Sequence, residues 1–166
     1  SPDTEPVLMR QFVRKVSAEA ARIAPDYSFE IDLAPDLPPA EADVDLLGQV
    51  MRNLYENAVK YSPDGRTIRT TVVERNGCIV LSVQDEGSGI ASQHVGSVFE
   101  RFRRPGADPT VRGMGLGLYL SRHLVEVQGG RIWAESPGVG FGATFSIELP
   151  IAREKRNAEA FDSGSR

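Results

Sequence analysis

Three polar residues near the middle of the chain have the spacing of a single helix face. Asn53, Asn57 and Lys60 are four and three residues apart, so their side chains would project from the same side of a helix. Amide oxygens are suitable ligands for Mg²⁺, whereas amide NH₂ groups and a lysine ammonium can donate hydrogen bonds to phosphate oxygens. The pattern therefore suits a metal-bound polyphosphate, and a solvated helix face is the alternative interpretation.

One carboxylate, Asp85, ends a run of apolar residues and is followed closely by Gly87 and Gly89. A carboxylate at the end of a buried strand needs a hydrogen-bond donor, and an adenine amino group would supply one. The glycines would let a flat ring approach the backbone closely. These residues indicate an adenine pocket, with an ordinary Asp-Glu-Gly-Ser-Gly turn as the alternative.

A glycine-rich run precedes a predicted helix at Gly113, Gly115 and Gly117. Backbone N–H groups and the positive end of the helix dipole at such a junction favour phosphate. The run does not have the Gly-x-Gly-x-x-Gly spacing of dinucleotide-binding proteins, and it lacks the Gly-Lys-Ser/Thr of a P-loop. The run therefore indicates a phosphate-binding loop of a class other than these two, and a flexible loop is the alternative interpretation.

Hydrophobic periodicity predicts the elements that position these residues. Apolar residues three and four apart predict three helices. The first covers residues 7–23 and the third covers residues 116–128. The second begins after a cap at Asp43 or Asp45 and ends at a stop that starts with Ser62. Alternation predicts strands over 27–33, 67–74, 78–84, 131–135 and 141–149, with a tight hairpin turn at Asn76-Gly77. Residues 92–112 have no regular pattern and are predicted to be a mobile loop.

Composition limits the class of protein. The 166 residues fit one domain over 7–150, preceded by a linker at 1–6 and followed by a loose tail at 151–166. A net charge of -4 offers no general attraction to nucleic acid, so none is expected as a partner. Cys78, the only cysteine, excludes an intrachain disulfide. No apolar run is long enough to cross a bilayer, so we expect no direct membrane contact from this fragment, which we expect to be monomeric and cytoplasmic within a membrane-anchored parent protein.

The motifs occur in a specific order. The segment Asn53–Tyr61 resembles the N box of bacterial two-component sensor histidine kinases, and Asp85–Ile90 resembles their G1 box. Val98–Phe102 is similar to the F box and Gly113–Leu118 to the G2 box, while Gly140–Phe145 resembles the closing glycine motif. The resemblance covers about residues 7–150 and points to the catalytic, ATP-binding domain of these kinases.

The resemblance implies a fold. It is the Bergerat ATP-binding fold, an α/β two-layer sandwich of the α+β type. A mixed, mostly antiparallel sheet of about five strands would carry about three helices on one face, and a flexible ATP lid would lie between the F and G2 boxes.

The resemblance also implies site residues, with ATP and Mg²⁺ as cofactors. Asn57 would coordinate Mg²⁺, Asn53 and Lys60 would contact phosphates, and Asp85 would accept a hydrogen bond from the adenine amino group. The other implied nucleotide contacts are Tyr61 and Thr144, the glycines Gly87 and Gly89, the run Gly113, Gly115, Leu116 and Gly117, and a lid arginine, Arg104 or its neighbour Arg101. The implied catalytic residues are Glu56, Asn57, Lys60 and Arg104; Glu56 is either an aid to the acceptor or a solvated helix residue.

The resemblance favours phosphoryl transfer over hydrolysis. In ATP-hydrolysing members of the superfamily a water-activating glutamate aligns with Asn53, and an amide cannot accept the proton of water. The two histidines, His94 and His123, do not lie in an acceptor motif. We therefore expect the acceptor histidine on a dimerisation domain outside this sequence, with a cognate response regulator as the later recipient. A related serine kinase and a non-catalytic nucleotide-binding module are the alternatives.

Overall fold

The computed structural model describes residues 1–63, 66–100 and 117–153. The helices are α1 (Met9–Ile23), α2 (Val44–Tyr61) and α3 (Gly117–Glu126), with a short 3₁₀ helix η1 at Ser92–Ser97. The strands are β1 (Glu5–Val7), β2 (Ser28–Leu33), β3 (Ala40–Ala42), β4 (Thr67–Arg75), β5 (Cys78–Asp85), β6 (Arg131–Glu135) and β7 (Ala143–Pro150).

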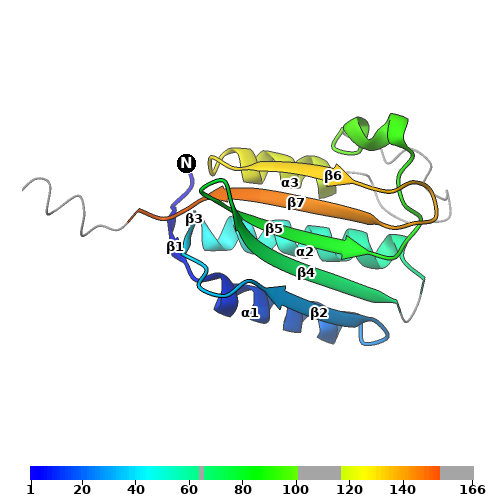
Figure 1. The fold of residues 1–166 in the computed structure, drawn as a ribbon, viewed down its shortest axis with the longest axis horizontal. Coiled ribbons are helices and arrows are strands. Elements are labelled where there is room, and N and C mark those ends of the chain that lie inside the picture. Colours follow the sequence, from blue (N-terminus) through cyan, green and yellow to red (C-terminus); the bar gives the residue numbers. More distant parts are fainter. Residues whose placement is uncertain (64–65, 101–116, 154–166) are drawn as a thin grey trace, which may run out of the picture.

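Two layers build the molecule (Figure 1). Five strands form one sheet in the order β2-β4-β5-β7-β6, in which β2 pairs with β4 in parallel and the other neighbours are antiparallel. The helices α1, α2 and α3 all lie behind this sheet in the view of Figure 1, so one face of the sheet is covered. The predicted α/β sandwich with a mixed, mostly antiparallel sheet is confirmed.

The core lies between the two layers. Alternate residues of β5, namely Ile79, Leu81 and Val83, are buried, because successive side chains of a strand point to opposite faces. They meet the apolar stripe of α2, which is the stripe that periodicity predicts: Leu47, Val50, Met51, Leu54 and Ala58 are all buried. Burying each such side chain contributes about 1.5–3 kcal/mol, so this contact fixes how α2 lies on the sheet.

The predicted hairpin turn joins β4 to β5. Asn76 has a φ of 53° and Gly77 a φ of 76°, the pair of positive angles that a two-residue turn of type I′ requires. The turn sets the register that pairs Arg75 with Cys78 and, at the other end, Arg69 with Gln84. Asp85 is thereby placed at the far end of β5, beside the residues that begin β4.

The N-terminal region differs from the sequence prediction. Glu5–Val7 form β1, which pairs with β3, so residues 5 and 6 belong to a strand where a linker was predicted, and α1 begins at Met9. At the other terminus Ala152 donates its backbone N–H to the carbonyl of Pro39 at 2.9 Å, so the predicted tail begins with paired residues. These pairings join segments that are far apart in the chain. The short segments involved lie near prolines, so their sequences do not indicate that they form strands.

Two predicted features, the lid between the F and G2 boxes and the tail beyond Arg153, lie outside the described residues. Among the helices that are described, none combines the length and the apolar character needed to cross a membrane.

Candidate nucleotide-binding site

Helix α2 carries the predicted amide face and is fixed at both ends. Asp43 caps its first turn, because one carboxylate oxygen accepts from the backbone N–H groups of Asp45 and Leu46, both at 3.1 Å. At the other end the Tyr27 hydroxyl donates to the carbonyl of Ser62 at 2.9 Å, and the carbonyl of Val59 lies 3.2 Å away as the alternative acceptor. These contacts hold α2 in one position along the sheet.

A buried tyrosine joins the middle of α2 to the sheet. The Tyr55 hydroxyl lies 2.6 Å from Oγ1 of Thr70 on β4, and its ring packs edge-on against Phe29 at 5.7 Å. Burial raises the pKa of Tyr55, although hydrogen bonds to Thr70 and Ser17 act in the opposite direction. Residues on the other sides of α2, including Asn53 and Asn57, are held by the same anchor.

Asn53 and Asn57 differ in their surroundings. Asn57 is buried, with 9% of its surface exposed. Asn53 is only half-buried and donates from Nδ2 to Ser121 Oγ at 3.3 Å and to the Gly117 carbonyl at 3.5 Å. Ser121 in turn donates to the Gly117 carbonyl at 2.7 Å. The structure thus brings Asn53 to the first turn of α3, which is where the predicted phosphate-binding run ends.

Asp85 is held by the backbone. Only 3% of its surface is exposed, and its Oδ1 accepts from the N–H groups of Gly87 at 2.9 Å and Ala143 at 3.1 Å. The sequence predicts adenine as the donor to this carboxylate, whereas in the structure the backbone amides of Gly87 and Ala143 supply two donors. A carboxylate has about four acceptor positions, so an adenine amino group remains compatible with these bonds.

Gly87 and Gly89 allow backbone segments to touch. A Cβ atom on Gly87 would lie 2.1 Å from the carbonyl oxygen of Tyr61, and one on Gly89 would lie 2.1 Å from that of Gly138. Ser88 between them donates its N–H to the Tyr61 carbonyl at 2.9 Å. The structure therefore brings Asp85, both glycines and the backbone carbonyl of Tyr61 together at one end of the molecule, and it leaves no room for a side chain at either glycine.

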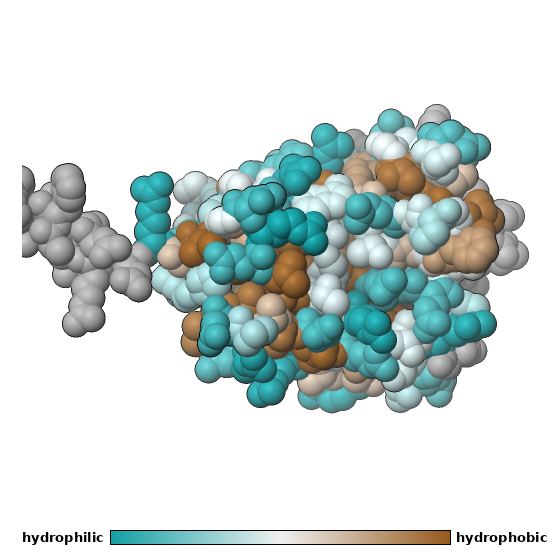
Figure 2. All heavy atoms as spheres, viewed as in Figure 1, coloured by the Kyte–Doolittle hydropathy of each residue, from teal (hydrophilic) through white to brown (hydrophobic). Residues whose placement is uncertain are grey.

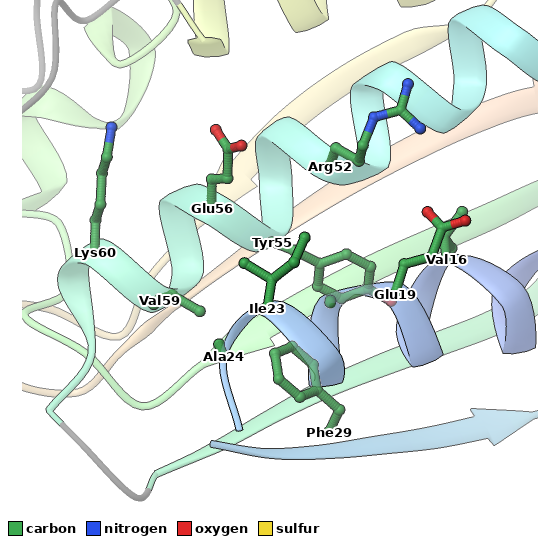
Figure 3. Close-up of a pocket in the computed structure, with 11 residues that line it drawn as sticks. Val16, Glu19, Ile23, Ala24, Phe29, Arg52, Tyr55, Glu56, Val59 and Lys60 are labelled. Atoms are coloured by element: carbon green, nitrogen blue, oxygen red, sulfur yellow. The ribbon is translucent and has the colours of Figure 1, made fainter. Parts of the chain in front are cut away.

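Glu56 and Lys60 are both exposed on α2. Figure 3 shows both side chains pointing away from α1, at the rim of a pocket of about 260 Å³ between α1 and α2. Val16, Ile23 and Phe29 contribute its apolar lining, whereas neither Asn57 nor Asp85 lines it. The hollow thus borders Glu56 and Lys60 but not the proposed adenine and Mg²⁺ contacts at Asp85 and Asn57.

Thr144 lies on the other face of the sheet. It lines a shallow polar hollow of about 200 Å³ together with Ser82, Ser146 and Trp133, on the face that no described helix covers. Figure 2 shows that face, where hydrophilic and hydrophobic residues are interspersed. Ala143, the residue paired with Asp85 in the sheet, donates its backbone N–H to the carboxylate, whereas the side chain of Thr144 points to the opposite face. The structure does not bring the Thr144 side chain to the other candidate residues.

Several residues at the site were missed by sequence reasoning. Ser121 contacts Asn53, and Gly142, whose φ is 74°, approaches Asp85 so closely that a Cβ would lie 2.2 Å from its carbonyl oxygen. The Ser136 hydroxyl accepts a hydrogen bond from the backbone N–H of Ile90, in the loop after Asp85. Gly142 stands inside the closing glycine motif, which was a signal for it, but the isolated serines carried none. Arg101, Arg104, Gly113, Gly115 and Leu116 lie outside the described residues.

The geometry suits an adenine nucleotide. A buried carboxylate next to a glycine loop can recognise a base, and the first turn of α3 offers backbone N–H groups for phosphate. At Gly117 a Cβ would meet no other described residue within 4 Å. Among the described residues no group of three or more histidine, cysteine or acidic side chains forms a metal site. Asn57 offers an amide oxygen, a hard ligand that suits Mg²⁺ shared with phosphate oxygens and water.

A two-layer sandwich with a polar helix face, a buried carboxylate and a glycine loop is typical of ATP-binding domains. A profile of the histidine kinase-, DNA gyrase B- and HSP90-like ATPase family matches residues 42–153. This match covers more than half of the chain, and the chain belongs to that family. Family membership implies that the chain uses a nucleotide.

Two curated relatives are a sensory kinase and a sensor protein. The chain is similar to the adaptive-response sensory kinase SasA of Prochlorococcus marinus, with 40% identity over 128 residues that make up 76% of this chain and 33% of the relative. It is 32% identical over 145 residues to the sensor protein KdpD of Clostridium acetobutylicum, covering 86% of this chain and 16% of that protein. The chain thus spans a third or less of these curated relatives.

Solved structures show the same fold. The mycobacterial sensor histidine kinase MprB superposes with a TM-score of 0.77 at 28% identity, covering 92% of this chain and all of that one. Full-length ShkA, solved in complex with AMPPNP, superposes with a TM-score of 0.79 at 27% identity over 93% of this chain and 32% of ShkA.

Proposed function

We propose that this chain is the catalytic, ATP-binding domain of a sensor histidine kinase. It binds ATP with Mg²⁺ and transfers the γ-phosphoryl group to a histidine on a dimerisation domain outside this sequence. A response regulator then receives the phosphoryl group. The observation that carries the proposal is the assembly of Tyr61, Asp85, Gly87 and Gly89 at one end of a fold shared with sensor kinases.

Each element of the site has a proposed part. Asp85 and its glycine loop receive the adenine, next to Tyr61. Asn53 and the start of α3 at Gly117 lie beside each other, where backbone N–H groups can contact phosphates. Asn57 holds Mg²⁺, which when bound offsets phosphate charge. Glu56 and Lys60, both exposed on α2, would contact the acceptor or the phosphates.

The remaining proposed contacts come from residues that the structure does not describe. Arg104, or Arg101, offsets charge on the transferred group, and the run Gly113, Gly115 and Leu116 completes the phosphate-binding segment. The side chain of Thr144 is not part of this proposal, because it lies on the uncovered face of the sheet.

The amide of Asn53 supports transfer rather than hydrolysis. Its NH₂ group donates to Ser121 on α3, a bond that an ionised glutamate could not make. With no carboxylate there to take a proton from water, the γ-phosphoryl group is left for another nucleophile. In the proposed step an imidazole nitrogen forms a bond to the γ-phosphorus, the bond to the bridging oxygen breaks, and ADP leaves.

The acceptor must come from outside the chain. His123 is exposed on α3 and His94 lies in η1, and neither has the surroundings of an acceptor on a dimerisation helix. A reaction that uses ATP and Mg²⁺ fits a cytoplasmic setting.

Phosphoryl transfer to a partner domain tests the proposal. The chain is mixed with radiolabelled Mg-ATP and the histidine-bearing dimerisation domain of its parent protein, and label on that domain is followed. We expect an acid-labile label, because phosphohistidine hydrolyses in acid, and at least a tenfold loss with Asn57→Ala. Asp32→Ala, at the exposed edge strand β2, is the control and should transfer normally. An acid-stable label would point to a serine kinase, and absence of label with intact nucleotide binding would point to a binding module.

A further inference from the structure

Ser136 lies in the connection between β6 and β7 and contacts the loop that follows β5. Its hydroxyl accepts from the N–H of Ile90 at 3.0 Å and from that of Gly138 at 3.2 Å. It donates to the carbonyl of Gly142 at 2.6 Å, a shorter contact than the 3.3 Å to the Gly138 carbonyl. One side chain thus links three backbone positions.

The hydrogen-bonding capacity of this hydroxyl is fully used. A serine hydroxyl has one proton to donate and two lone pairs that accept. The proton is donated to the carbonyl of Gly142, and the two lone pairs accept from the N–H groups of Ile90 and Gly138. Alanine at this position would leave two amides and a carbonyl without these partners, while threonine keeps the hydroxyl.

The contacts made by Ser136 belong to a larger set of backbone bonds. Gly140 donates its N–H to the Ser88 carbonyl at 2.7 Å, and Gly142 donates to the Gly87 carbonyl at 3.1 Å. At the right-hand edge of Figure 1 the β6–β7 connection lies beside the segment that leaves β5. The loop of residues 87–90 is therefore bonded along its length to residues 136–142.

Ser136 supplies the only side chain in this set of bonds. The other bonds join backbone to backbone and persist with any side chain that the local conformation admits, whereas the bond from Ile90 depends on the hydroxyl. Ile90 itself is buried, so its N–H has little access to water as a replacement partner. Among the contacts of the described residues, the Ser136 hydroxyl is thus the partner of the Ile90 N–H at the end of the loop.

We propose that Ser136 is a positioning residue for nucleotide binding, because its hydroxyl holds the loop of residues 87–90 at the place where it receives the adenine base. The inference rests on the proposed function. Ser136 does not touch the nucleotide in this arrangement; it acts through Gly87 and Gly89, which flank the base beside Asp85. Its removal therefore lowers affinity for the adenosine part of the ligand and leaves the phosphate and Mg²⁺ contacts intact.

Calorimetric titration of Ser136→Ala tests the inference. We expect affinity for ADP and for a non-hydrolysable ATP analogue to fall about three- to tenfold, by the same factor for both, as expected for one or two lost hydrogen bonds. Ser136→Thr should restore most of the affinity. Ser82→Ala is the matched control, since it removes one hydroxyl pair, to Ser146 at 2.8 Å, on the uncovered face of the same sheet. It should bind normally.

Amide hydrogen exchange gives a readout that does not depend on ligand. In Ser136→Ala the N–H of Ile90 should exchange at least tenfold faster, while amides in the middle of β4 keep their protection. Equal affinity in wild type and Ser136→Ala, or unchanged exchange at Ile90, would overturn the inference. Equal loss of protection throughout the sheet, without rescue by threonine, would show a merely structural role. Failure of the wild-type chain to bind either nucleotide would instead count against the proposed function.

Discussion

At the residue scale the candidate site depends on backbone segments that approach more closely than side chains would permit. Gly87, Gly89 and Gly142 each face a carbonyl oxygen that a Cβ atom would meet at 2.1 or 2.2 Å. Contacts of this kind place the loop after Asp85 against both α2 and the β6–β7 connection. The glycines are thus required by the fold itself, with or without a ligand. The proposed base pocket forms because they let these backbone segments pack closely.

Comparing Gly89→Ala with Gly129→Ala separates the cost of a steric clash with a neighbouring carbonyl from the cost of a positive φ angle. Gly89 and Gly129 both have positive φ, 69° and 83°, so alanine at either costs about 1–2 kcal/mol in conformational strain. Only at Gly89 would the new Cβ also meet a carbonyl, that of Gly138, whereas at Gly129 no described residue lies within 4 Å. We expect Gly89→Ala to lose at least about 2 kcal/mol more stability in urea unfolding than Gly129→Ala, with weaker nucleotide binding. Equal losses in the two variants would contradict this account.

At the scale of elements, features set by local sequence were predictable. The apolar stripe of α2 and the Asn76-Gly77 turn depend on residues close in the chain, and the structure has both. Strand β3 was missed because three residues near prolines acquire their strand conformation only by pairing with β1, about 35 residues away. The direction of Thr144 follows from alternation, since Ala143, Phe145 and Ile147 face the core, whereas the pairing of Ala143 with Asp85 depends on the register of β7 against β5, which local sequence does not reveal.

The cap of α2 gives a prediction about pH. The backbone N–H of Asp3, at 2.9 Å, and next that of Leu46 lower the pKa of Asp43 below its ordinary value. A carboxylate with a lowered folded pKa adds stability above its unfolded pKa, and this contribution is lost as the pH falls through the folded value. Asp43→Asn should therefore be less stable than wild type at pH 7, with a difference that shrinks below about pH 4. Urea unfolding between pH 7 and pH 3 measures it, and parallel pH profiles would refute the assignment.

At the scale of the whole molecule the candidate site exists only in the folded chain. Asn57 comes from α2, Asp85 from the end of β5, Ala143 from the start of β7 and Gly117 from α3. Only the packing of both layers brings these segments together, through the contact between α2 and the sheet and that between Asn53 and α3. Since an unfolded chain has no such arrangement, ligand binding and folding are linked.

Thermal unfolding with nucleotide therefore reports on the assembled site. A ligand at 100 times its dissociation constant stabilises the fold by about 2.7 kcal/mol. In a domain of this size each 1 kcal/mol raises Tm by about 2–4 °C, so Mg-ATP analogue should raise it by about 5–11 °C. In Asp85→Ala, measured at the same ligand concentration, the rise should be under about 2 °C, because the base loses its acceptor and the loop loses the anchor for Gly87. Asp32→Ala, a surface aspartate on β2, should keep the full rise. A rise in Asp85→Ala equal to that of the wild type would mean that the nucleotide binds elsewhere on the fold.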